Sequence, residues 1–216
     1  FSIRRLPALD LTGLIGVQFV LPWGLLRGIL REAREFKPDV IHTHNLFFRT
    51  TEAVALLRRF LSVPLVTTLH LGALEGNEKL LNFLVRLYEA TMGRYVLRAS
   101  DAVTAVSAAV AEHGGQVSSA KRRIQVIPNG VDTVVFQPGQ VPEKPEIIFV
   151  GRLVPNKGPL TMVRAAARVN RRYPEARFTL VGDGPQRQRL EREAARLGIT
   201  GAIRFTGVRD DVPEML

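Results

Sequence analysis

The sequence predicts an α/β protein made of two units, each built on a parallel sheet. Short apolar runs rich in β-branched residues alternate with longer segments of helical periodicity along most of the 216 residues. Strands that are apolar along their whole length are buried on both faces, and in α/β proteins helices cover those faces. Hydrophobic residues make up 46% of the chain, which is enough to build a substantial core.

Seven strands and six helices are expected from this pattern. The strands cover residues 39–42, 65–69, 102–106, 124–127, 147–150, 178–181 and 203–206. The helices cover residues 25–36, 51–61, 77–98, 107–113, 159–172 and 185–197. The first helix is amphipathic, because its apolar residues recur at helical spacing and charged residues fill the positions between them.

The alternation breaks once, at residues 137–145, where three prolines and a glycine cannot continue a helix or a central strand. A new run of strands and helices begins at Ile147. We therefore expect an N-terminal domain at residues 1–140 and a C-terminal domain at residues 141–216. Each domain is expected to be Rossmann-like, with a cleft between the two and ligands beyond the carboxyl ends of the strands.

Composition excludes several classes of protein. The chain has no cysteine, which excludes a disulfide scaffold, thiol catalysis and iron–sulfur centres. The net charge of +10 favours a polyanionic partner: nucleic acid, anionic lipid or a phosphorylated small molecule. Nucleic acid is the least favoured of the three, because the Arg residues are evenly spread, aromatic residues make up only 7% and no recognition motif is present.

The longest apolar stretch, residues 11–30, does not predict a membrane-spanning helix, because glycines, Pro22 and Arg27 interrupt it. This region is both apolar and basic, so a peripheral membrane contact stays open as an alternative. The sequence begins at Phe1 rather than at Met, and at Leu216 it ends where a helix is about to start. We interpret it as a piece of a longer protein.

The strongest local signal is a strand that ends at Gly151 and is followed by a loop with two cations, Arg152 and Lys157, and no carboxylate. A helix is expected to start at Pro159, and the free N–H groups at a helix N-terminus favour an anion. Arg can grip two phosphate oxygens, while Lys adds a point charge. The loop predicts a diphosphate site. An ordinary exposed loop with solvated cations is the alternative.

A second loop after a strand, Gly182-Asp183-Gly184, is a weaker signal. Glycines at this position let the backbone approach a ligand or turn tightly into a helix. The loop does not complete a dinucleotide-binding G-x-G-x-x-G motif, because Arg187 stands at the last glycine position. We interpret it as a tight turn.

Three of the four histidines lie at expected strand ends: His42, His44 and His70. Together they could bind a metal, but no carboxylate stands beside them in the sequence, and a metal is not expected. We interpret His70 as a hydrogen-bonding or acid–base group at a cleft edge, with a structural histidine as the alternative. His113 precedes two glycines and is expected to cap the C-terminus of its helix.

Seven segments occur in the order seen in the family-four retaining glycosyltransferases. They are residues 39–44, 67–70, 101–107, 128–132, 149–153 with 157–158, 180–185 and 205–207. Each segment alone is a weak signal, but seven in order with consistent spacing form a strong one. The chain therefore resembles this family over residues 38–216.

The resemblance implies a GT-B fold, whose C-terminal domain holds a nucleotide sugar and whose N-terminal domain holds the acceptor. The residues it assigns to catalysis are His70, Arg152 and Lys157. Those it assigns to the donor diphosphate are Gly151, Arg152 and Lys157, and those it assigns to the nucleotide base are Val208 and Arg209. The acceptor side of the cleft is expected to include His44, Asn45, Asn129 and Gly130.

The implied reaction is transfer of a hexosyl-type sugar from a UDP- or GDP-sugar, with retention of configuration and without a metal or other cofactor. The acceptor is expected to be lipid-linked, a glycan or a small molecule, and the protein to be cytoplasmic or peripheral at the inner face of the membrane. Two parts of the family's site, a Gly-rich loop and a pair of glutamates, are expected before Phe1 and after Leu216. The alternative function is a non-catalytic module that binds nucleotide or nucleic acid.

Overall fold

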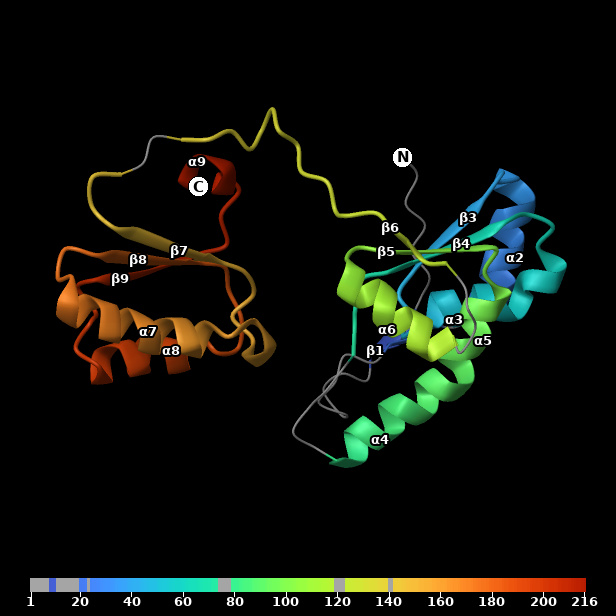
Figure 1. Cartoon of the computed structure of the whole chain (residues 1–216), viewed down its shortest axis with the longest axis horizontal. Coiled ribbons are helices and arrows are strands. Elements are labelled where there is room, and N and C mark those ends of the chain that lie inside the picture. The colour runs from blue at the N-terminus through green and yellow to red at the C-terminus, as the bar shows by residue number, and fades with distance from the viewer. Residues whose placement is uncertain (1–7, 11–19, 23, 74–78, 119–122, 140–141) are drawn as a thin grey trace. The chain divides into compact units, whose positions relative to one another are not determined.

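The computed structural model describes residues 8–10, 20–22, 24–73, 79–118, 123–139 and 142–216 (Figure 1). The chain divides into two compact units, Phe1–Asn129 and Gly130–Leu216. The sequence placed the domain boundary later, after residue 140, and residues 140–141 lie outside the described part.

Four parallel strands form the main sheet of the first unit, in the order β3–β4–β5–β6. They are β3 (Ile41–His44), β4 (Leu65–Leu69), β5 (Ala102–Ala105) and β6 (Gln125–Val126), so the four expected strands are confirmed. β3 lies two residues further along the chain than expected. The Thr43 hydroxyl lies 2.9 Å from that of Thr67 on β4, and Asn45, with a left-handed φ of 60°, ends the strand.

The helices of this unit are α2 (Leu25–Phe36), α3 (Arg49–Leu57), α4 (Lys79–Tyr88), α5 (Arg94–Ala99) and α6 (Ala108–Ser118), with a short 3-10 turn at Arg58–Phe60. The long helix expected at residues 77–98 is interrupted, because a π-helical turn, η2 (Glu89–Gly93), joins α4 to α5. A core cluster of buried residues lies between the helices and the sheet. It includes Leu46, Leu69, Val96, Leu97, Val103 and Ala105.

α6 corrects the expectation for His113, because the helix runs five residues past it to Ser118. Gly114 is therefore a helical residue and does not end the helix. A Cβ at Gly114 would lie 2.5 Å from Leu69 Cδ1 and 2.9 Å from Ile124 Cδ1. The glycine lets α6 pack closely on the sheet.

A two-stranded antiparallel ribbon, β1 (Ala8–Asp10) with β2 (Val20–Pro22), was not expected from the sequence. It takes up part of the long apolar stretch, of which residues 11–19 and 23 lie outside the described part. Among the helices that the structure describes, none is both long enough and apolar enough to cross a membrane.

The second unit has three parallel strands in the order β7–β8–β9: β7 (Glu146–Val150), β8 (Arg177–Val181) and β9 (Ile203–Gly207). Helices α7 (Pro159–Arg172) and α8 (Arg187–Arg196) lie together along one face of this sheet (Figure 1). The expected strands and helices are confirmed, and a short helix, α9 (Val212–Met215), follows β9. The core contains Leu153, Val163, Phe178, Leu180 and Leu190, all at most 2% exposed.

Candidate active site

The predicted anion loop of the second unit is held in place by backbone contacts and one buried side chain. The Gly151 N–H donates to the Val181 carbonyl at 2.9 Å, and the Leu153 N–H donates to the Asp183 carbonyl at 2.9 Å. The Leu153 side chain is fully buried. These contacts fix the loop between β7 and α7 against the loop after β8.

Both predicted cations of this loop are exposed and available. Within the described residues, neither Arg152 nor Lys157 makes a hydrogen bond or an ion pair with another side chain. Lys157 ends a 3-10 turn, and Gly158, with a φ of 71°, leads into Pro159 at the start of α7. No acidic residue stands in the first turn of α7, so nothing there neutralises the positive end of the helix dipole. This arrangement can bind an anion with several oxygens.

The two glycines of the next loop have a packing role. A Cβ at Gly182 would lie 2.0 Å from the Gly151 carbonyl oxygen, and one at Gly184 would lie 2.7 Å from that of Leu153. Only glycine allows the two loops to approach so closely. The glycines thus shape the anion loop by packing against it, which goes beyond a simple tight turn.

Val208 and Arg209 follow β9 directly and lie at the same edge of the sheet, because the Gly182 N–H donates to the Gly207 carbonyl at 2.7 Å. The Val208 side chain is 76% exposed. Arg209 Nε donates to Asp211 Oδ1 at 2.7 Å, and this pair lowers the pKa of Asp211 and raises that of Arg209. The guanidinium is therefore engaged by Asp211, which leaves the backbone of this segment for a ligand.

In the first unit the structure brings three histidines together at the ends of β3 and β4. His44 Nδ1 lies 2.9 Å from His70 Nε2, and His42 Nε2 lies 2.7 Å from Thr68 Oγ1. The Asn45 side chain accepts a hydrogen bond from the His70 backbone N–H at 2.8 Å. Burial, together with the neighbouring His42 and His70, lowers the pKa of His44 and favours its neutral form.

The other two predicted acceptor-side residues are not drawn into this cluster. Asn129 and Gly130 are exposed and stand on either side of the division between the units. No hydrogen bond among the described residues joins them to the histidines. Within the described part of the chain, no three His, Cys, Asp or Glu side chains are placed to hold a metal ion.

Sequence reasoning missed a buried polar network behind the histidine cluster. Glu52, only 6% exposed, accepts hydrogen bonds from Arg49 at 2.8 Å and from the Tyr88 hydroxyl at 2.6 Å. Tyr88 Oη also lies 2.6 Å from the Leu46 carbonyl oxygen. Burial and Glu52 raise the pKa of Tyr88 far above its usual range. The network links α3 and α4 to the segment that follows His44, and its polar residues lie too far apart in the sequence to be paired from the sequence alone.

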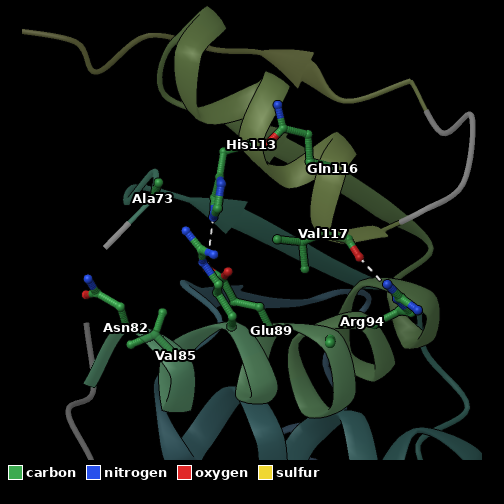
Figure 2. Close-up of a pocket in the computed structure, with 10 residues that line it drawn as sticks. Ala73, Asn82, Val85, Glu89, Arg94, His113, Gln116 and Val117 are labelled. Atoms are coloured by element: carbon green, nitrogen blue, oxygen red, sulfur yellow. Dashed lines mark hydrogen bonds and ion pairs between the residues drawn. The ribbon is translucent and has the colours of Figure 1, made fainter. Parts of the chain in front are cut away.

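A pocket of about 370 Å³ in the same unit was also missed (Figure 2). It is lined by α4, the π-helical turn, the first residue of α5, α6 and Ala73, which follows His70 by three residues. Glu89 and His113 face each other there, and His113 Nε2 lies 2.8 Å from Glu89 Oε1. The one available signal was Glu89, the only carboxylate in the helical segment at residues 79–98.

Comparison with known families gives two matches that together cover most of the chain. The model "Glycosyltransferase Family 4" matches residues 10–135, more than half of the chain, and "Glycosyl transferases group 1" matches residues 131–216. The chain belongs to glycosyltransferase family 4. The family that the seven sequence segments indicated is thereby confirmed.

Curated relatives agree with this membership. The chain is 29% identical to a 2-deoxystreptamine N-acetyl-D-glucosaminyltransferase of Streptomyces fradiae, over 96% of the chain and 54% of that protein. It is 31% identical to a D-inositol 3-phosphate glycosyltransferase of Acidothermus cellulolyticus, over 77% of the chain and 42% of that protein. The chain thus spans about half the length of the curated family members it matches.

Solved structures show the fold of this family-4 chain. A structure of HepE from Anabaena, in complex with UDP, matches with a TM-score of 0.68 and 22% identity, over 88% of the chain and 53% of HepE. A structure of TarM from S. aureus matches with a TM-score of 0.61 and 10% identity, over 89% of the chain and 38% of TarM. The fold class is GT-B, as the sequence predicted.

Proposed function

We propose that the whole protein transfers a sugar from a nucleotide-diphosphate sugar to an acceptor hydroxyl, with retention of configuration. The observation that carries the proposal is the loop with Arg152 and Lys157 at the N-terminus of α7, in a family-4 chain. The relatives' names support sugar transfer and include GDP-mannose-dependent enzymes, and the HepE structure holds UDP. A UDP- or a GDP-sugar therefore suits as donor, and no further cofactor is proposed.

In the proposed reaction, the bond between the sugar and the diphosphate breaks as negative charge builds on the leaving group. Arg152 can take two of its oxygens, Lys157 adds a second positive charge, and the N-terminus of α7 points its dipole at the same place. The acceptor hydroxyl attacks from the face that the diphosphate leaves, and its proton passes to the leaving phosphate. These charges stabilise the departing group without a metal, and no protein nucleophile is needed.

His70 is proposed to contact the transferred sugar. Its side chain is half-buried at the carboxyl edge of β4, where open parallel sheets bind ligands, and Asn45 and His44 hold its backbone and its ring. The proposed acceptor side consists of His44, Asn45, Asn129 and Gly130. The proposed site of the nucleotide base is the backbone at Val208 and Arg209. Replacing His70 by Ala should lower turnover strongly and leave the melting temperature within a few degrees.

Calorimetry on this chain tests the donor site. UDP or GDP should bind to the wild type, and Arg152→Ala should abolish most of that binding. Arg171→Ala is the matched control, because Arg171 lies in the last turn of the same helix, α7, and should leave binding unchanged. Equal loss in both variants would refute the assigned site. Steeply salt-dependent binding of an oligonucleotide in place of a nucleotide would favour the alternative of a nucleic-acid-binding module.

A peripheral contact with an anionic membrane surface is a finer part of this proposal. α4 has no buried residue, and Leu80, Phe83 and Leu84 on it are each at least 50% exposed. A helix with exposed apolar side chains, in a chain whose net charge is +10, suits an anionic lipid surface. Flotation with anionic vesicles should recover the wild type and much less of Phe83→Ser, whereas neutral vesicles should recover little of either.

A further inference from the structure

The pocket that Glu89 and His113 line has more basic than acidic side chains around it. Two arginines, Arg86 and Arg94, line it together with the Glu89–His113 pair. Figure 2 shows Glu89 and His113 directed toward each other across the pocket, with Asn82 on one side and Arg94 on the other. The amides of Asn82 and Gln116 also line it, and Val85 and Val117 supply apolar surface.

The π-helical turn is what places Arg94 at this pocket. Asn82, Arg86 and Glu89 follow one another at helical spacing, and a regular helix would continue that face with Gly93. The wider turn at Glu89–Gly93 adds one residue, so that Arg94, five positions after Glu89, takes the place on the same face. Turns of this kind occur often at functional sites.

His113 gives the buried Glu89 side chain a hydrogen-bond partner, with His113 Nε2 2.8 Å from Glu89 Oε1. Glu89 is 8% exposed, and a carboxylate in such a place is destabilising unless it is paired. Among the residues that line the pocket, Arg86 and Arg94 carry two positive charges against the one carboxylate of Glu89. Arg94 Nε donates to the Val117 carbonyl at 3.3 Å, while Arg86 is exposed and has no hydrogen-bond or ion-pair partner in the described part of the chain.

We propose that this pocket binds a phosphorylated polyol, with Arg86 and Arg94 on the phosphate and the amides of Asn82 and Gln116 beside its hydroxyl groups. The pocket's excess positive charge disfavours a polyol that carries amino groups. Its role as an acceptor site rests on the proposed function, since Ala73 at its rim follows His70 by three residues. The phosphate could be that of a free sugar or cyclitol phosphate, or of a lipid headgroup with the same chemistry.

Calorimetry on the whole chain tests the proposal, with myo-inositol 1-phosphate and glucose 6-phosphate as soluble probes. At least one should bind, and Arg86→Ala should weaken it at least about 10-fold, as expected when a charge-assisted contact is lost. Arg98→Ala is the matched control: Arg98 is exposed on the neighbouring helix α5 and does not line the pocket. It should change the affinity less than about 2-fold. Inositol, inorganic phosphate and 2-deoxystreptamine should each bind at least about 10-fold more weakly than the better probe.

Flotation with phosphatidylinositol vesicles, compared with phosphatidylglycerol vesicles, distinguishes a lipid headgroup from a soluble phosphate. Recovery that prefers phosphatidylinositol and is lost in Arg86→Ala assigns the phosphate to a lipid. Three results would overturn the inference. The first is an equal effect of Arg86→Ala and Arg98→Ala, and the second is tighter binding of 2-deoxystreptamine than of the phosphorylated probes. The third is that neither the soluble probes nor the vesicles bind. UDP and GDP titrations separate the two proposals, because Arg86→Ala should leave nucleotide binding intact. If nucleotide binds normally and no phosphorylated polyol does, only the pocket inference fails.

Discussion

His44 Nδ1 and His70 Nε2 lie 2.9 Å apart, so the ends of β3 and β4 are joined through two imidazole rings. A neutral histidine has one donor and one acceptor nitrogen, and the contact therefore requires opposite roles of the two nitrogens. Asn45 holds the His70 backbone from the same strand end. His44 thus orients the ring that we place against the donor sugar.

The first prediction concerns this orientation. His44→Ala in the whole enzyme should lower kcat by roughly 10-fold, since a misplaced group near the reaction centre loses rate quickly. His44→Gln, which keeps a hydrogen-bonding group, should recover part of the loss. The melting temperature should change little in either variant, because His44 is only partly shielded from solvent and lies outside the hydrophobic core. A loss of stability that matches the loss of activity per mole of protein would contradict the positioning role.

The second prediction concerns pH. Burial, and then His42 and His70, lowers the pKa of His44 below its ordinary value of about 6.5. The folded protein therefore binds fewer protons here than the unfolded chain does. The stability that this group contributes is fully present above about pH 6.5 and is lost as the pH falls through the lowered pKa. Urea unfolding at several pH values should show a steeper loss below that pH for the wild type than for His44→Gln; parallel curves would contradict the shift.

The third prediction concerns the donor loop. Lys157→Ala in the whole enzyme should lower turnover by about 100-fold, by analogy with the loss of one preorganised charge-stabilising donor. Lys157 is exposed and ends a short 3-10 turn, so the folded state should keep its stability. Lys144→Ala, at another exposed lysine of the same unit, should leave turnover unchanged. Normal turnover in Lys157→Ala would remove Lys157 from the diphosphate site.

The donor loop could be predicted because its signals are local. A strand, two cations and the start of a helix lie within thirteen residues, 147–159. None of these signals depends on contacts with distant parts of the chain. The contact between His44 and His70 could not be predicted in the same way. It depends on the register of β3 against β4, in which His44 stands opposite Thr68, and register is set by pairing across the sheet.

The helices show the same difference between local and distant causes. Periodicity located the helical segment at residues 77–98, but the π-helical turn at Glu89–Gly93 leaves that periodicity almost unchanged. The glycine pair after His113 predicted a helix end because glycine is a poor helix former. Packing of α6 on Leu69 and Ile124 overrides that preference. The pocket beside Glu89 depends on both features, so the sequence did not reveal it.

The last prediction uses this glycine pair, whose two members face different surroundings on one helix. Gly114 is buried and a Cβ there would meet Leu69 Cδ1 at 2.5 Å, whereas a Cβ at Gly115 would meet nothing within 4 Å. Gly114→Ala should lower the free energy of unfolding by about 1–3 kcal/mol, because two side chains of the core must move. Gly115→Ala should raise it by about 0.5–1 kcal/mol, since alanine is the better helix former. Denaturant unfolding of the two variants measures both, and equal effects would show that α6 does not pack on β4 as closely as the structure has it.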